Sequence, residues 1–334
     1  MTRASPAAWF AMTFAAVLEA LQRFRRTRVS PIRLCRIRWR RPSRPQSYRG
    51  TALPGPIVLV IGAVLALCAT SSNAANEQSV QIDGVDTVVW TPEDKPHQLL
   101  PIVVFSHGLY TCATQSRFIT RAIADAGYFV IAPNHEDSAC AFTLGWLGFS
   151  RLPGKPAMLW TDADYRDRAD DIRAIVAALP HDARFRDKID IERLALAGHS
   201  LGGYTVLGLA GAWPSWKLPG VKAVLAFAPY AMPFSRSEGF RHLGVPVMYQ
   251  AGGFDPAFTR SVHRAFEESP FPKYYVEIDK AWHLAWTDVG GMHRDEIVAN
   301  AITFLDMYVK AIVTGPTAAS GLVPARPPAE SSIN

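Results

Sequence analysis

The first 74 residues contain almost no negative charge. Residues 1–50 carry twelve arginines and a single acidic residue, Glu19, and residues 51–74 carry no charged side chain at all. The rest of the chain is mildly acidic, with 23 lysines and arginines against 28 aspartates and glutamates. The net charge of +6 is therefore +11 on the leader (residues 1–74) and −5 on the body (residues 75–334), which argues against nucleic-acid binding by the body.

The leader also lacks an apolar run of membrane-spanning length. Its apolar core, residues 57–67, has the length of a signal-sequence h-region, whereas a membrane span needs roughly 20 residues. Ser72 and Ala74 then provide the small residues that a signal peptidase recognises. We therefore expect export, with cleavage after Ala74 and a secreted or periplasmic mature chain.

Three alternatives stay open for the leader. Cys68 could accept a lipid, although the bulky Leu67 before it departs from the small residue expected at that position. An uncleaved leader would anchor the protein to a membrane. Finally, residues 1–50 are long for the basic region of a signal sequence, and a start codon assigned too far upstream would explain them.

Cysteine is scarce, with four residues in the whole chain. Cys35 and Cys68 lie in the leader, so the body keeps Cys112 and Cys140. A pair of cysteines in an exported body predicts a disulfide, and closing its loop of about 28 residues would stabilise the fold by roughly 3 to 4 kcal/mol. Two separate buried thiols are the alternative.

The body alternates short apolar runs with longer helical patterns. Strands are expected at residues 86–91, 101–107, 128–134, 193–199, 222–229, 245–252 and 273–279. Helices are expected at about residues 114–126, 164–179, 201–212, 257–268 and 293–312. Several strands are continuous apolar runs, which is typical of strands covered on both faces. The pattern predicts an α/β fold, a doubly wound and mostly parallel sheet with helices on both faces, in one domain over residues 75–313.

Two segments fall outside this alternation. Residues 138–163 are too long and too aromatic for a simple connection, so we expect a lid over a site or a packed surface excursion. Residues 314–334 are small, polar and proline-rich, and we expect them to be disordered.

The stretch LALAGHSLGGYTVLG, residues 194–208, predicts a strand, a sharp turn and a helix, with Ser200 at the tip. Gly198, Ser200 and Gly202 match G-x-S-x-G, a turn so sharp that the residues two before and two after the serine must lack a side chain. Ligands of an open parallel sheet bind beyond the carboxyl ends of its strands. Ser200 is therefore the predicted nucleophile, and an idle serine in a glycine turn is the alternative.

A serine hydroxyl needs a general base, and the base needs an acid to orient it. In this architecture the acid and then the histidine follow the serine along the chain. Asp255 and His283 each come directly after a predicted strand, which makes them the candidate acid and base. Asp279 and Asp288 are alternative acids, and Asp255 could be an ordinary turn or cap residue.

The developing oxyanion needs two backbone donors. One is predicted to be the N–H of Leu201, at the start of the helix after the nucleophile, where the helix dipole adds its positive end. The other is predicted to be the N–H of Leu109, on the glycine-containing loop after the second predicted strand. His107 and His199 are expected to pack and brace loops. We expect no cofactor and no metal ion.

The motifs FSHGL (105–109), GHSLGG (198–203), GGFD (252–255) and WHLAW (282–286), with TDADYRDRADDI (161–172), resemble the α/β-hydrolase superfamily. Within it they resemble bacterial relatives of platelet-activating-factor acetylhydrolase and dienelactone hydrolase, over roughly residues 80–312. The resemblance implies a triad of Ser200, Asp255 and His283, with Leu109 and Leu201 forming the oxyanion hole. It also implies a serine esterase acting on a small-molecule or lipid ester.

Two residues depart from these families. Dienelactone hydrolases have cysteine at the position of Ser200, so a lactone of that kind is disfavoured. Acetylhydrolase-like sequences often have glycine where this chain has Tyr110, which affects the second oxyanion donor or the room beside the acyl group. An apolar pocket for an acyl chain is expected from aromatic residues near the strand ends, namely Phe142, Trp146, Phe149, Trp160, Phe234, Trp282 and Trp286.

These observations predict an exported serine hydrolase that cleaves carboxylic esters through an acyl-enzyme. An acyltransferase or a peptidase with the same triad is the alternative among enzymes. A non-catalytic binding protein tethered to a membrane by an uncleaved or lipidated leader is the alternative of a different class.

Overall fold

The computed structural model describes residues 75–93, 98–139 and 155–311. The predicted leader, the predicted tail and most of the predicted lid, residues 140–154, lie outside the described residues. Within the described ranges, no helix combines the length and the apolar character needed to cross a membrane.

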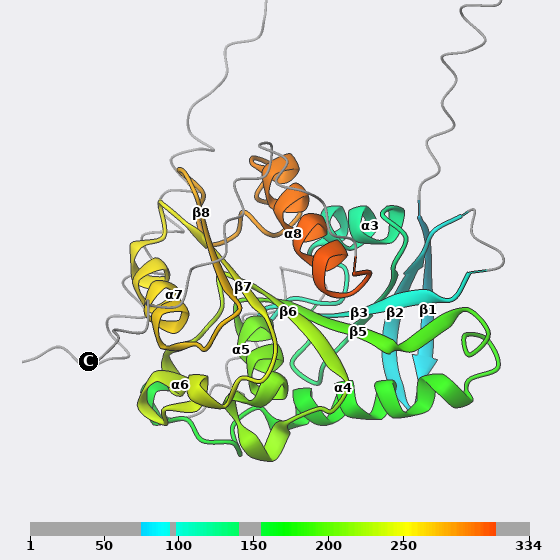
Figure 1. Ribbon diagram of the computed structural model, residues 1–334, viewed down its shortest axis with the longest axis horizontal. Helices are drawn as coiled ribbons and strands as arrows, with labels where there is room; N and C mark the ends of the chain where they lie inside the picture. Colours follow the sequence, from blue (N-terminus) through cyan, green and yellow to red (C-terminus); the bar gives the residue numbers. More distant parts are fainter. Residues whose placement is uncertain (1–74, 94–97, 140–154, 312–334) are drawn as a thin grey trace, which may run out of the picture. The chain divides into compact units, whose positions relative to one another are not determined.

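An eight-stranded sheet forms the centre of the body, in the order β1-β2-β4-β3-β5-β6-β7-β8 (Figure 1). The strands are β1 (Asn76–Ile82), β2 (Val85–Thr91), β3 (Leu100–Ser106), β4 (Phe129–Pro133), β5 (Ile189–His199), β6 (Val221–Phe227), β7 (Val247–Gly252) and β8 (Lys273–Ile278). β2 is antiparallel to both of its neighbours, and every other pairing is parallel. The prediction of a mostly parallel sheet is confirmed.

Strand β1 was not predicted from the sequence. Its residues, NEQSVQI, are mostly polar, and all but the buried Ile82 are partly or fully exposed. It occupies the edge of the sheet, where one hairpin partner, β2, is enough to hold it. An edge strand therefore leaves little of the apolar signal by which a buried strand is recognised.

Helices cover both faces of the sheet. They are α3 (Arg117–Asp125), α4 (Arg166–Ala178), α5 (Leu201–Leu207), α6 (Met232–Arg236), α7 (Pro256–Glu268) and α8 (Arg294–Tyr308). The helix expected at 201–212 is α-helical only to Leu207 and continues as a π-helical turn, η4 (Gly208–Ala212), in which Gly211 has a φ of 122°. Short 3₁₀ turns complete the structure: η2 (Ala157–Leu159), η3 (Leu179–His181), η5 (Pro214–Trp216) and η6 (Gly239–His242).

The sheet separates two apolar cores. Buried side chains of α3 and α8 pack on one face, and those of α4, α5 and α7 pack on the other, as Figure 1 shows. Strand β3 contributes to both cores, because Ile102 and Val104 face one side while Val103 and Phe105 face the other, all fully buried. This two-sided burial explains why the inner strands are continuous apolar runs.

Parallel pairing brings the carboxyl ends of the inner strands to one edge. Ser106 at the end of β3 pairs with Gly198 of β5, and His199 of β5 pairs with Phe227 at the end of β6. The loops that leave these strands therefore begin side by side. The predicted residues Leu109, Ser200, Leu201, Asp255 and His283 lie on loops or helix starts at this edge.

Candidate active site

Ser200 lies in a sharp turn between β5 and α5. Its φ of 55° and ψ of −115° are unusual for a residue with a side chain. The turn is possible because glycines surround it: a Cβ at Gly198 would clash with the Gly202 carbonyl, and a Cβ at Gly202 would clash with the backbone of Ser106. Glycine is therefore required at position 198 by the turn itself and at position 202 by the close packing of the turn against β3.

The side chains of Ser200, His283 and Asp255 form one hydrogen-bonded chain. His283 Nδ1 is 2.8 Å from Asp255 Oδ2, and His283 Nε2 is 3.0 Å from Ser200 Oγ. A carboxylate can only accept, so Nδ1 carries the proton and Nε2 presents its lone pair to the serine hydroxyl. The imidazole is therefore oriented to take the proton of Ser200.

The structure distinguishes among the candidate acids. Asp255 precedes Pro256 at the start of α7, yet its side chain makes no capping hydrogen bond and bonds His283 instead. Asp279 is exposed and its carboxylate lies 3.5 Å from Lys280. Asp288 accepts the backbone N–H of Phe118 at the start of α3. Asp255 is the carboxylate that meets the histidine.

Two backbone amides are available beside Ser200. A Cβ at Gly108 would lie 3.6 Å from the Ser200 Cβ, so the loop carrying Leu109 runs next to the serine. Neither the Leu109 N–H nor the Leu201 N–H donates to an acceptor within the described part of the chain. Tyr110 has a φ of 52°, a left-handed backbone conformation that glycine adopts without strain.

His199 connects this loop to the histidine of the site. Its Nε2 lies 2.9 Å from the His283 carbonyl, and its Nδ1 lies 3.1 Å from Nε2 of Gln115. The other end of the Gln115 amide, Oε1, accepts the N–H of Gly108 at 3.0 Å. Burial, followed by the neighbouring His283, lowers the pKa of His199 to about 3. His199 is therefore neutral and, as predicted, braces the backbone on both sides of the site.

Gln115 was missed in the sequence, because nothing in its local pattern distinguishes it from a surface glutamine before a helix. Ser116 follows it and donates to the carbonyl of Trp286, while the Gln115 carbonyl accepts the N–H of Asp288. These contacts join residues about 170 positions apart. They attach the start of α3 to the loop that carries His283.

Aromatic side chains lie beside His283. The ring centroids of Phe258 and His283 are 4.0 Å apart. The ring centroids of Tyr230 and Phe258 are 6.0 Å apart, and those of Trp160 and Tyr230 are 5.0 Å apart. Among the predicted pocket aromatics, Phe234 and Trp286 are fully buried core residues, Trp282 packs against the core, and Phe142, Trp146 and Phe149 lie outside the described residues. Phe258 and Tyr230 were not predicted.

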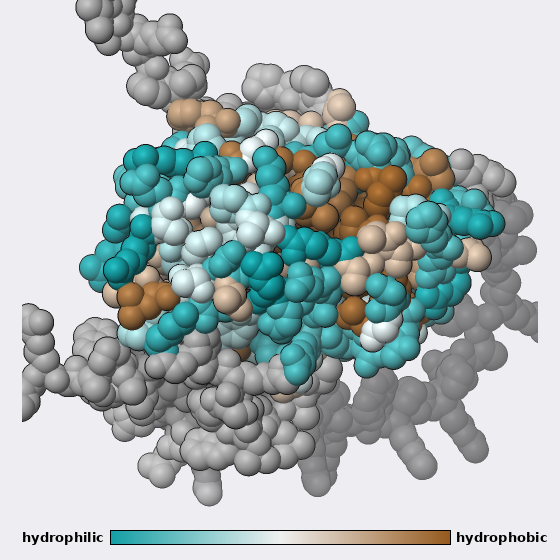
Figure 2. Space-filling model, turned by 90° about the horizontal axis from the view of Figure 1, so that it is seen from below, coloured by the Kyte–Doolittle hydropathy of each residue, from teal (hydrophilic) through white to brown (hydrophobic). Residues whose placement is uncertain are grey.

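Apolar side chains are exposed on three neighbouring segments of the chain. Met158 and Leu159 on η2, Met232 on α6 and Phe254 after β7 all have at least 39 % of their surface exposed. The face viewed in Figure 2 is mainly hydrophilic, with apolar areas between the polar residues. Single exposed apolar residues are common in soluble proteins, so these four do not by themselves indicate a binding surface.

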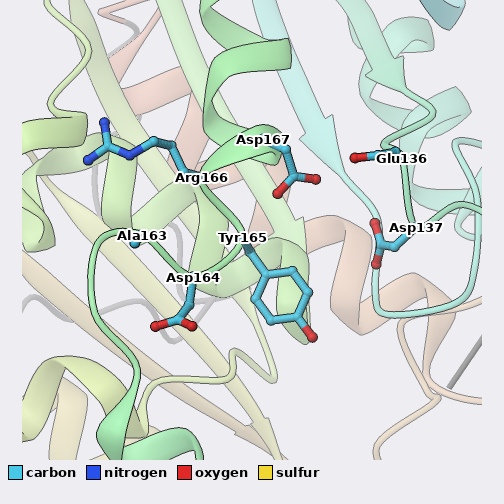
Figure 3. A pocket seen from close by; sticks show the side chains of 7 residues that line it. All are labelled: Glu136, Asp137, Ala163, Asp164, Tyr165, Arg166 and Asp167. Carbon is cyan, nitrogen blue, oxygen red and sulfur yellow. The ribbon is translucent and has the colours of Figure 1, made fainter. Parts of the chain in front are cut away.

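A pocket of about 430 Å³ lies at the start of α4 and is shown in Figure 3. Its wall is formed by Glu136, Asp137, Ala163, Asp164, Tyr165, Arg166 and Asp167. Burial raises the pKa of Asp167, and the negative charges of Asp137 and Glu136 add to the shift while Arg168 opposes it. The pocket is acidic, and its lining includes none of the three residues of the hydrogen-bonded chain.

The sequence also predicted a disulfide between Cys112 and Cys140. Cys112 is buried and disulfide-bonded, but Cys140 lies outside the described residues, so their pairing stays a prediction. No cluster of three or more histidine, cysteine, aspartate or glutamate side chains suited to a metal ion occurs among residues 75–93, 98–139 and 155–311.

Comparisons with known proteins found a matching family, similar sequences and a similar fold. The profile of a family described as alpha/beta hydrolase fold matches residues 101–216. Cutinase est2 of Thermobifida alba is 32 % identical over 104 residues, covering 30 % of this chain and 32 % of the cutinase. Platelet-activating factor acetylhydrolase of Bos taurus is 24 % identical over 192 residues, covering 46 % of this chain and 43 % of that enzyme.

A solved structure is similar over most of the body. The dienelactone hydrolase of Anabaena variabilis superposes with a TM-score of 0.53 at 18 % identity, covering 70 % of this chain and 99 % of the other. At that identity the likeness concerns the fold. The alignments with the two curated relatives span less than half of the length of either relative.

Proposed function

Because this chain belongs to the α/β-hydrolase superfamily, we propose that it is an exported serine hydrolase that cleaves carboxylic esters. One observation carries the proposal: the hydrogen-bonded chain Ser200–His283–Asp255 lies next to the N–H groups of Leu109 and Leu201, which donate to no acceptor in the described part of the chain. A nucleophile, a base, an orienting acid and a site for the oxyanion are the parts that acyl transfer requires.

In the first half of the reaction, Ser200 Oγ attacks the ester carbonyl. His283 Nε2 takes the hydroxyl proton, and the imidazole becomes a positively charged imidazolium. Asp255 stabilises that charge through the hydrogen bond from Nδ1–H. The carbonyl oxygen becomes negative and accepts from the N–H groups of Leu109 and Leu201. His283 then gives the proton to the leaving alcohol, and an acyl-serine remains.

In the second half, water attacks the acyl-serine. His283 accepts a proton from the water, the tetrahedral oxyanion again uses the two amides, and the proton returns to Ser200 as the carboxylic acid leaves. Side chains and backbone groups of this chain supply the nucleophile, the proton transfers and the stabilisation of the oxyanion. The proposed mechanism therefore needs no cofactor.

The substrate class is proposed on two grounds. The relatives named above are a cutinase and an acetylhydrolase, both named for ester-type substrates. The half-buried rings of Phe258, which lies against His283, and of Tyr230, which lies next to Phe258, offer an apolar surface to an acyl chain or lipid tail. We therefore propose a short-chain or lipid-like ester as the substrate. The proposal of export to the periplasm or medium rests on the leader sequence.

The test is ester hydrolysis by the full chain and by its Ser200→Ala variant. We expect turnover of p-nitrophenyl esters by the wild type and a loss of about 10⁶-fold in kcat in the variant, because the nucleophile is removed. Ser79→Ala, at an exposed position of β1, is the matched control and should keep full activity.

Circular dichroism and thermal melting would show that Ser200→Ala keeps the fold. A folded variant with near-wild-type turnover would refute the mechanism. Faster acyl transfer to an added alcohol than to water would favour the acyltransferase, and cleavage of amides would favour the peptidase. A folded wild type that turns over no ester of any chain length would favour the binding protein.

A further inference from the structure

Arg168, on the first turn of α4, is a charged residue buried in the protein interior. Its side chain has no exposed surface, and it forms an ion pair with Asp137, whose side chain is 2 % exposed. Arg168 Nε donates to Asp137 Oδ1 at 3.0 Å and Nη2 donates to Oδ2 at 3.3 Å. A buried ion pair is costly to desolvate, so its position calls for a reason beyond stability.

The remaining guanidinium donors reach the loop beside Ser200. Nη1 donates to the His107 carbonyl at 2.9 Å, and Nη2 donates to the Gly108 carbonyl at 3.4 Å. Nη1 also lies within reach of the hydroxyls of Ser106 and Thr205. Arg168 therefore joins α4 to two successive peptide groups of the loop.

The Gly108 carbonyl belongs to the same peptide group as the Leu109 N–H. A peptide group is planar and trans, so its C=O and N–H point in opposite directions. Whatever holds the Gly108 oxygen therefore also sets the direction of the Leu109 N–H. That N–H is one of the two amides available to an oxyanion.

His107 and Thr111 hold the same oxygen. The backbone N–H of His135 donates to His107 Nε2, so Nε2 is the acceptor and Nδ1 carries the proton that bonds the Gly108 carbonyl at 2.7 Å. The Thr111 hydroxyl lies 2.7 Å from the same carbonyl. Burial, followed by the charge of Arg168, lowers the pKa of His107 to about 3, so His107 stays a neutral donor.

The pair also ties the loop to a fixed element. Asp137 follows β4 and faces the first turn of α4, as Figure 3 shows, while α4 packs on the sheet through Ala169, Ile172 and Ile175. His107 and Thr111 belong to the loop itself, and His107 is tied to the segment after β4 by the N–H of His135. Arg168 ties the loop to α4 as well.

We infer that Arg168, held in place by Asp137, is a positioning residue that aims the Leu109 N–H at the oxyanion. The inference rests on the proposed function, since it concerns the oxyanion site of that reaction. Arg168 touches neither Ser200 nor His283, and its contribution passes through the Gly108–Leu109 peptide.

The test uses Arg168→Lys in the full chain. A lysine keeps the charge, but its single ammonium cannot reach the Asp137 carboxylate and both loop carbonyls together. Removing an oxyanion donor outright costs about 10²- to 10³-fold in kcat, so a misdirected donor should cost about 10- to 100-fold, with little change in KM. Arg173→Lys is the matched control, because Arg173 lies on the same helix and bonds Asp170 and Ser215 at the surface.

A second readout separates positioning from general damage to the fold. Thionoesters place sulfur where the ester has its carbonyl oxygen, and sulfur is longer-bonded and a weaker acceptor, so the preference for oxygen over sulfur reports on the oxyanion donors. We expect this preference to shrink in Arg168→Lys and to stay unchanged in Arg173→Lys. The pH dependence of kcat/KM should keep its midpoint in both variants, because His283 and Asp255 are not altered.

Two results with a folded Arg168→Lys variant would contradict the positioning role of Arg168. A folded Arg168→Lys with wild-type kcat, or with reduced kcat and an unchanged oxygen preference, overturns the inference. If Arg168→Lys does not give a cooperative melt, Asp137→Asn, which loosens the same arginine, is judged by the same two criteria. A wild type without esterase activity overturns the proposed function, and wild-type activity with an unaffected Arg168→Lys overturns the positioning role alone.

Discussion

At the scale of single residues, the site depends on a side chain that bonds a distant partner instead of its own helix. Asp255 stands at the N-cap of α7, where aspartate commonly accepts a backbone N–H. Its carboxylate bonds His283 instead. The helix thus forgoes a side-chain cap, and the histidine is held in the tautomer that a base requires.

Asp255→Asn should therefore keep the fold and lose much of the activity. An asparagine amide can present its NH₂ to His283 and favour the wrong tautomer, so we expect kcat to fall by about 10⁴-fold, less than in Ser200→Ala. Asp279→Asn, at an exposed position next to the same loop, is the control and should leave kcat unchanged. Steady-state kinetics on a p-nitrophenyl ester would measure both, and equal losses in the two variants would contradict the assignment of the acid.

At the scale of elements, the turn at Ser200 is set by how closely β5 and α5 approach β3. Gly202 stands where any side chain would meet the carbonyls of Ser106 and His107. The two oxygens are backbone atoms of a buried strand and its loop, so they cannot move aside as a flexible side chain could.

Gly202→Ala should consequently move both Ser200 and the Leu109 loop. We expect a loss of about 2 kcal/mol or more in the free energy of unfolding from overpacking, and a fall in kcat of about 100-fold from misplacement of the reacting groups. In Gly244→Ala the new Cβ would meet only the end of the Lys217 side chain, which makes it the control. Urea unfolding and ester kinetics measure the two effects, and an active, stable Gly202→Ala would show that the turn tolerates a side chain.

Edge strand β1 is attached to α3 by charge. Glu77 of β1 bonds Arg117 and Arg121 of α3 and accepts the indole N–H of Trp90. Partial burial alone would raise the pKa of Glu77, but the hydrogen bonds from Arg117, Trp90 and Arg121 outweigh it and hold the pKa below its usual value of 4.5.

A lowered folded-state pKa means that the stabilisation by Glu77 is fully present above about pH 4.5 and is lost as the pH falls through the folded-state pKa. Glu77→Gln should thus lower the free energy of unfolding by about 0.5 to 1 kcal/mol at pH 7, and the difference from the wild type should shrink towards pH 3. Urea unfolding across this range measures it, with Glu192→Gln on β5 as an exposed control. A difference that does not change with pH would rule out an ionic origin.

At the scale of the whole molecule, every residue of the site and both apolar cores lie between residues 75 and 311. Residues 75–334 alone should therefore fold and hydrolyse esters with the kcat/KM and the melting temperature of the full chain. The two proteins would be compared in the same detergent-free buffer. A truncated chain that melts lower or turns over more slowly would mean that the leader contributes to the folded body.

By itself, the sequence determined the parts that rest on local pattern. Continuous apolar runs predicted the inner strands, and glycines on both sides of Ser200 predicted the turn, because these depend on neighbours a few residues apart. The position of a polar residue directly after a strand singled out Asp255 and His283. The mostly polar edge strand β1 left no such pattern.

Only the tertiary structure decided which groups meet. It joined Asp255 rather than Asp279 or Asp288 to His283, and it placed Gln115 and Arg168 against loops far away in the sequence. These contacts depend on the order of strands in the sheet and on which face each helix covers. A residue's local pattern carries no information about a partner 60 or more positions away, so such bracing is visible only once the chain has folded.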